Sequence, residues 1–139
     1  TRKAFLHSHS YTGNALACRA ALATLDIFEQ DNVLENNLTL AKVMHDAARH
    51  FADHPHIAEV RQQGMILAIE MVQNKASRIV YPWQERRGLR ACQHALTQGM
   101  LLRPLGDVIY FMPPYVITPD EIQLLAEAAW QGINLATQN

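Results

Sequence analysis

The chain has 139 residues, 49% of them hydrophobic and 18% charged, with a formal net charge of −1. This composition excludes a largely disordered chain, and 12 basic against 13 acidic residues, without a long run of one sign, disfavour a surface for nucleic acid or an anionic membrane. No apolar run approaches the ~18 residues of a membrane-spanning helix and no secretory signal opens the chain, so the cytoplasm is the expected compartment.

Two helices are predicted at the N-terminal end. Behind the polar segment 7–14, apolar residues recur at the spacing of a helix that ends near Gln30: Leu16, Ala20, Ala23 and Ile27. Asp31 is expected to cap the second helix, whose two apolar rows pack on more than one neighbour. That helix stops at residues 53–55, where a proline follows a histidine.

The middle of the chain changes to strand patterns. Residues 57–61 predict a short strand, and the nearly continuous apolar run Met65–Val72 predicts a strand covered on both faces. A loop then leads to a predicted helix over residues 85–98. Gly99 is expected in the left-handed conformation after its last turn.

The C-terminal part predicts a β-hairpin and a final helix. Met100–Arg103 and Val108–Met112 are its strands, and residues 104–107 form its turn. A capping box begins the last helix at Thr118, with Pro119 in the first helical position. The fold class is therefore α+β: a small, mainly antiparallel sheet with flanking helices.

The positions of the cysteines and histidines do not predict a metal site. Cys18 and Cys92 each lie in an apolar helical pattern and are expected to be buried, reduced thiols. The seven histidines include two pairs spaced two residues apart, but no second ligand cluster accompanies them as zinc requires, so no metal is expected.

Two places carry residues suited to binding an anion. Ser10 and Thr12 lie in a hydroxyl-rich segment before a helix, where they either bind a phosphate or cap the helix, and spacing alone favours capping. Arg103 lies in an apolar hairpin, where its guanidinium either pairs with a carboxylate or reaches solvent. Tyr110, across the same hairpin, is a weak candidate for the same region.

Two segments together resemble the class III pyridoxal-phosphate-dependent aminotransferases of fold type I: residues 7–18, HSHSYTGNALAC, and residues 99–115, GMLLRPLGDVIYFMPPY. Between them, VRQQGM with AIE resembles the strand pair that opens the family's C-terminal small domain. The resemblance implies that residues 1–30 come from the large domain, and that residues 31–139 form the C-terminal small domain.

The second segment resembles, more narrowly, the branch of the class that moves an amino group from S-adenosylmethionine to 8-amino-7-oxononanoate in biotin biosynthesis. The alternatives are another class III aminotransferase, of the ornithine or ω-amino acid type, and a free-standing α+β ligand-binding module.

The resemblance also implies roles for individual residues. Ser10, with Tyr11 and Thr12 beside it, is expected to bind the phosphate of pyridoxal 5'-phosphate, and Ser10 does so across a dimer interface. Arg103 is expected to bind the substrate carboxylate, and Tyr110 to line the same substrate site. The expected partners are small-molecule substrates, the chain's own large domain and a second identical subunit.

The family's catalytic lysine is missing. Schiff-base chemistry needs a lysine amine, which the family places in a Ser-Lys context. The lysines here are Lys3, Lys42 and Lys75, and none stands in that context. Because the chain also begins without methionine, we expect it to be a piece of a longer enzyme, with no catalytic residue of its own and no activity alone.

Overall fold

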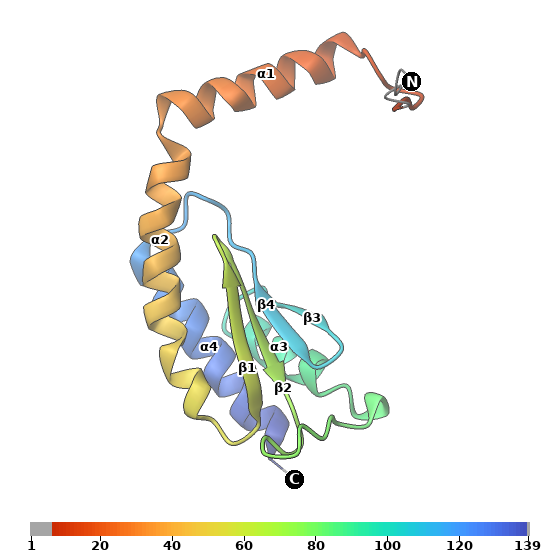
Figure 1. Ribbon diagram of the computed structural model, residues 1–139, viewed down its shortest axis with the longest axis vertical. Helices are drawn as coiled ribbons and strands as arrows, with labels where there is room; N and C mark the ends of the chain where they lie inside the picture. The colour runs from red at the N-terminus through yellow and green to blue at the C-terminus, as the bar shows by residue number, and fades with distance from the viewer. Residues whose placement is uncertain (1–6, 139) are drawn as a thin grey trace, which may run out of the picture. The chain divides into compact units, whose positions relative to one another are not determined.

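The computed structural model describes residues 7–138. The chain divides into two compact units, Thr1–Leu34 and Glu35–Asn139. The order of helices and strands is the predicted one, with two short 3-10 helices added at Arg49–Asp53 and Trp83–Glu85. The elements labelled in Figure 1 are α1 (Ala15–Gln30), α2 (Val33–Ala48), β1 (Ile57–Gln63), β2 (Ile66–Met71), α3 (Arg87–Thr97), β3 (Arg103–Leu105), β4 (Val108–Phe111) and α4 (Pro119–Thr137).

The boundary between α1 and α2 differs from the prediction. The Oδ1 atom of Asn14 caps the start of α1, and the backbone N–H of Asp31 closes its end on the carbonyl oxygen of Ile27. Asp31 is therefore the C-cap of α1, and Asn32 lies between it and the first residue of α2. Asn32 follows with a φ of 48°, a left-handed conformation that asparagine tolerates and that separates the two helices.

The apolar side chains of α1 stay accessible. No residue of α1 is buried within this chain, and Leu16 is 83% exposed. The expectation that Cys18 is buried is therefore wrong for the described residues, in which Cys18 is exposed. Cys92 on α3 is buried as expected, and burial raises the pKa of its thiol to about 11.

The four strands form one antiparallel sheet in the order β1-β2-β4-β3. Burial alternates along β2: Leu67 and Ile69 are fully buried, whereas Ile66 is 48% exposed. The prediction that this strand is covered on both faces is therefore wrong for residues 7–138. The helices α3 and α4 cover one face (Figure 1), which we call the inner face; within the described residues 35–138 no helix covers the opposite, outer face.

The hairpin turn is shorter than predicted. Pro104 and Leu105 belong to β3, where they pair with Ile109 and Val108 of β4. The turn is formed by Gly106, whose φ is 60°, and the next residue. Proline is tolerated in β3 because this strand lies at the sheet edge, where one side of the backbone needs no partner.

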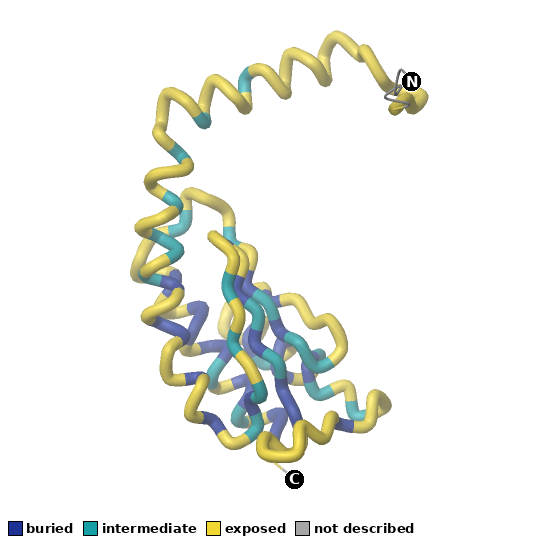
Figure 2. Tube along the Cα trace, in the orientation of Figure 1, coloured by how far each residue is buried: buried dark blue, intermediate teal, exposed yellow. Residues whose placement is uncertain are grey.

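The core lies between the inner face of the sheet and the helices, where the dark blue residues of Figure 2 gather. Ile122 and Ile133 of α4 contribute to it from the helix side. The predicted capping box at Thr118 and the positive φ of Gly99 are both confirmed. No helix in residues 7–138 is long and apolar enough to cross a membrane.

Candidate functional site

The outer face of the hairpin brings Arg103 and Tyr110 together, as the sequence predicted. The two residues are directly paired across β3 and β4. They line a cavity of about 250 Å³ whose other walls are mostly apolar. Those walls are formed by Leu101, Met112, Pro113, Pro114, Ile117 and Leu125. An apolar cavity with one guanidinium suits a ligand that joins a hydrocarbon part to an anionic group.

The guanidinium of Arg103 is available to such a ligand. Its side chain is exposed, and it has no hydrogen bond or ion pair within residues 7–138. The nearby acids have other partners: Glu70 binds Arg61 at 2.5 Å, and Asp107 accepts the backbone N–H of Gly88. Burial raises the pKa of Asp107, which further weakens it as a partner for Arg103. An internal structural bridge at Arg103 is therefore absent from the described part of the chain.

The segment before α1 leaves the hydroxyl of Ser10 without a hydrogen bond in the described residues. Thr12 closes a turn on His9, whose N–H donates to Thr12 Oγ1 at 3.0 Å. Asn14 caps the helix by accepting the N–H of Ala17 at 3.0 Å. The expectation that Ser10 or Thr12 caps α1 is therefore wrong.

Ser10 and Tyr11 are exposed, the latter by 72%. The ring of Tyr11 lies 4.1 Å from that of His9, measured between centroids. Ser10 and Arg103 belong to the two separate compact units. The structure therefore pairs Arg103 with Tyr110, the two candidates for substrate binding. The candidates for phosphate binding, residues 10–12, belong to the other unit.

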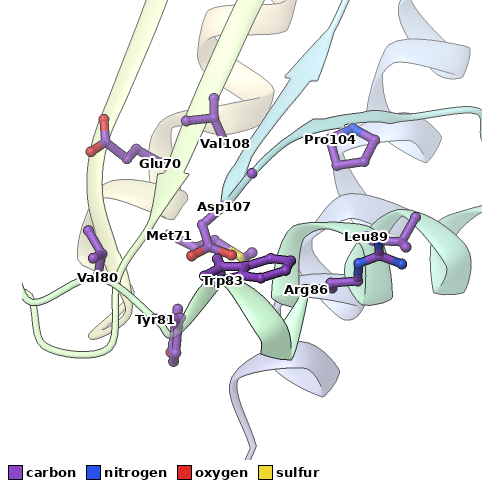
Figure 3. Close-up of a pocket in the computed structure, with 11 residues that line it drawn as sticks. Glu70, Met71, Val80, Tyr81, Trp83, Arg86, Leu89, Pro104, Asp107 and Val108 are labelled. Carbon is purple, nitrogen blue, oxygen red and sulfur yellow. The ribbon is translucent and has the colours of Figure 1, made fainter.

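A larger cavity of about 520 Å³, which sequence reasoning missed, lies at the turn end of the hairpin. Figure 3 shows its lining from the end of β2, the loop before α3 and the β3–β4 turn, with Trp83 and Asp107 among the side chains. Its residues are spread from position 70 to 108, so no local motif signals it. Nor does any group of three or more His, Cys, Asp or Glu suited to a metal occur among residues 7–138.

The sequence profile described as aminotransferase class-III matches residues 2–131. The chain therefore belongs to the class III aminotransferase family. It is 41% identical, over 135 residues, to the adenosylmethionine-8-amino-7-oxononanoate aminotransferase of Geobacter sulfurreducens; the match covers 97% of this chain and 30% of that protein.

Two solved structures agree with this assignment. The crystal structure of adenosylmethionine-8-amino-7-oxononanoate aminotransferase from Methanocaldococcus jannaschii matches with a TM-score of 0.89 at 40% identity, covering 96% of this chain and 30% of that one. The PMP-bound form of an aminotransferase from Vibrio fluvialis matches with a TM-score of 0.87 at 25% identity, covering 96% and 29%. The chain thus spans about 30% of the length of the relatives it matches.

Proposed function

We propose that this chain is the C-terminal part of a pyridoxal-phosphate-dependent aminotransferase that moves an amino group from S-adenosylmethionine to 8-amino-7-oxononanoate. The observation that carries the proposal is Arg103, a guanidinium without an internal partner in residues 7–138, beside Tyr110 in an apolar cavity. A keto acid with an aliphatic chain presents the matching carboxylate and hydrocarbon. The identity of 41% to a relative of that name supports the same substrates.

The described residues fit the phosphate of the cofactor. Ser10 offers a hydroxyl that has no hydrogen bond in residues 7–138, in the segment before a helix start. A helix start also provides free backbone N–H groups and a positive dipole end, which favour an anion. When bound, pyridoxal phosphate supplies an electron sink for the bond changes at the substrate carbon.

This chain contributes binding and orientation to the proposed reaction. Ser10 holds the phosphate of the cofactor; in a homodimer, this is the cofactor bound to the neighbouring subunit. Tyr11 and Thr12 shape the segment around Ser10. Arg103 holds the carboxylate of the acceptor, and Tyr110 flanks it on the next strand. The lysine that exchanges protons with the substrate would come from the part of the enzyme outside this chain.

The test uses the full-length protein that carries this segment, loaded with pyridoxal phosphate. With S-adenosylmethionine and 8-amino-7-oxononanoate we expect formation of 7,8-diaminopelargonate, measured by mass spectrometry. Ornithine and an ω-amino acid are offered as competing donors, each with a keto acid acceptor. Turnover with these donors alone would replace the proposal by another class III activity, and failure to retain the cofactor at all would favour a ligand-binding module.

A further inference from the structure

The outer face of the sheet carries a second arginine in the same row as Arg103. The strand registers align four residues across the sheet: Arg61, Ala68, Tyr110 and Arg103. The neighbouring row on the same face contains Glu59, Glu70, Val108 and Leu105. Two arginines therefore stand at opposite edges of one face, and two glutamates lie in the next row.

Both glutamates are held by Arg61. Its Nη1 atom lies 2.5 Å from Oε2 of Glu70 and 3.1 Å from Oε2 of Glu59. These hydrogen bonds raise the pKa of Arg61 further above its usual range. The three side chains are a third to a half exposed, so the cluster lies on the open face and not in the core.

Of the two glutamates, Glu70 lies nearer to Arg103. Only β4 lies between their strands, a lateral separation of about 10 Å at the usual strand spacing, and the two residues are also offset by two residues, about 7 Å, along the strands. On the outer face, Val108 and Tyr110 of β4 lie between Glu70 and Arg103. Glu59 is one strand farther away, on β1. Even short of contact, a free carboxylate within a Debye length of ~8–10 Å lowers the positive potential that attracts a substrate anion.

We propose that Arg61 is a positioning residue for substrate binding: it engages Glu70, and with it Glu59, so that Arg103 stays open to the carboxylate of the substrate. The inference rests on the proposed function of Arg103. Its physical basis is competition between two carboxylates for one guanidinium. A tethered carboxylate acts at a high effective concentration, so an unrestrained Glu70 reduces the fraction of protein ready to bind substrate.

The test compares Arg61→Ala with two double variants in the full-length, cofactor-loaded protein. If a freed Glu70 occupies Arg103 most of the time, the KM of the carboxylate-bearing acceptor rises about five- to tenfold, while kcat changes less than about twofold. Adding Glu70→Gln to Arg61→Ala restores the KM, because no competing carboxylate remains. Adding Glu59→Gln is the matched control and leaves the KM high, because Glu59 lies farther from Arg103.

A purely structural bridge predicts another outcome. The melting temperature then falls in Arg61→Ala, the KM stays at its original value, and Glu70→Gln rescues nothing; this result overturns the proposal. The methyl ester of the acceptor, which lacks the carboxylate, should show no change in KM in any variant.

The proposed function can fail separately, if the unmodified protein does not use these substrates. In that case the binding of nonanoate, a straight-chain monocarboxylate, to the same four proteins is measured by calorimetry. Weaker binding of nonanoate to Arg61→Ala and to the double variant with Glu59→Gln than to the other two proteins supports the role of Arg61. Equal affinities in all four proteins refute it.

Discussion

Arg103 either binds a substrate carboxylate or forms a structural bridge to an acid of its own chain, and its surroundings distinguish the two roles. It is exposed, it faces Tyr110, and no acid in residues 7–138 pairs with it. In the full-length enzyme, Arg103→Ala should therefore cost about 2–5 kcal/mol of transition-state stabilisation for the carboxylate-bearing acceptor, which lowers kcat/KM roughly thirtyfold or more. The melting temperature should stay unchanged.

Arg103→Lys provides the control for geometry at this site. An ammonium keeps the charge but cannot make the planar two-point contact, so it should recover only part of the efficiency. Steady-state kinetics and thermal unfolding on the same preparations give both quantities. Normal kinetics with a lowered melting temperature in Arg103→Ala would assign the residue to fold stability instead.

Ser10 and Asn14 allow cofactor binding to be separated from helix capping. Loss of the Ser10 hydroxyl should raise the dissociation constant for pyridoxal phosphate, since a hydrogen bond to a charged group contributes about 1.5–3 kcal/mol. Asn14→Ala should mainly destabilise the cofactor-free protein, by about 0.5–2 kcal/mol, because Asn14 is the actual cap of α1. Equal cofactor affinity in Ser10→Ala and the parent protein would remove Ser10 from the phosphate site.

His54 is a buried histidine whose ring takes part in two hydrogen bonds. Its side chain is 6% exposed, and its Nδ1 accepts the backbone N–H of His56 at 3.0 Å. The ring proton is therefore on Nε2, 3.2 Å from Oδ1 of Asn134 on α4. Burial lowers the pKa of His54 below 6.5, the hydrogen bond to Asn134 opposes this shift, and the charges of His56 and Lys75 add to the lowering.

This arrangement makes stability depend on pH in a defined direction. The unfolded chain takes up the proton near pH 6.5, before the folded chain does. The stabilisation is thus fully present above about pH 6.5 and is lost as the pH falls, by at most about 1.4 kcal/mol per unit. Denaturant unfolding of His54→Gln between about pH 7.5 and pH 5.5 should show a smaller loss than the parent chain. If the free energies of unfolding of the variant and the parent chain change equally with pH, the pKa of His54 does not change on unfolding.

At the scale of elements, the close approach of α3 and α4 depends on Gly132. A Cβ atom at this position would come within 3.0 Å of the carbonyl oxygen of Ala91, and backbone cannot move aside easily. Gly132→Ala should therefore reduce the free energy of unfolding by about 1–3 kcal/mol, although alanine is the better helix former.

The matched control for this helix pair is Gln123→Ala, on the exposed side of α4. It should change stability by less than about 0.5 kcal/mol. Denaturant unfolding of both variants gives the comparison. A stabilised Gly132→Ala would show that the two helices can separate enough to admit a methyl group.

At the scale of the whole molecule, the chain alone should not form a covalent link to the cofactor at one lysine. Lys75 donates hydrogen bonds to the backbone carbonyls of Ala52 and His54, and Lys42 lies on the exposed side of α2. Lys3 is outside the described residues. Treatment with pyridoxal phosphate and borohydride, followed by peptide mapping, should give only scattered, substoichiometric labelling.

The full-length enzyme is the positive control, with the label expected on a lysine outside this chain. Stoichiometric labelling of any one of the three lysines would contradict the assignment of catalysis to the missing part.

The sequence by itself determined the order and type of the elements, the antiparallel α+β class and the family. Periodicity, turn residues and the Thr118 capping box are local signals, and they act in the same way in any globular chain. Local chemistry also indicated the pair Arg103 and Tyr110, since residues seven apart on a short hairpin must lie close together. The family resemblance then supplied roles that no spacing rule supplies.

Only the tertiary structure decided which partner each group meets. The cap of α1 is a separate, local matter: the Oδ1 atom of Asn14 accepts the N–H of Ala17, three residues on. Cys18 on α1 and the whole apolar run of β2 were expected to be buried, yet within residues 7–138 Cys18 is exposed and Ile66 is 48% exposed. Most decisively, Glu70 pairs with Arg61 and not with Arg103, because strand register places side chains from different parts of the sequence within hydrogen-bond distance.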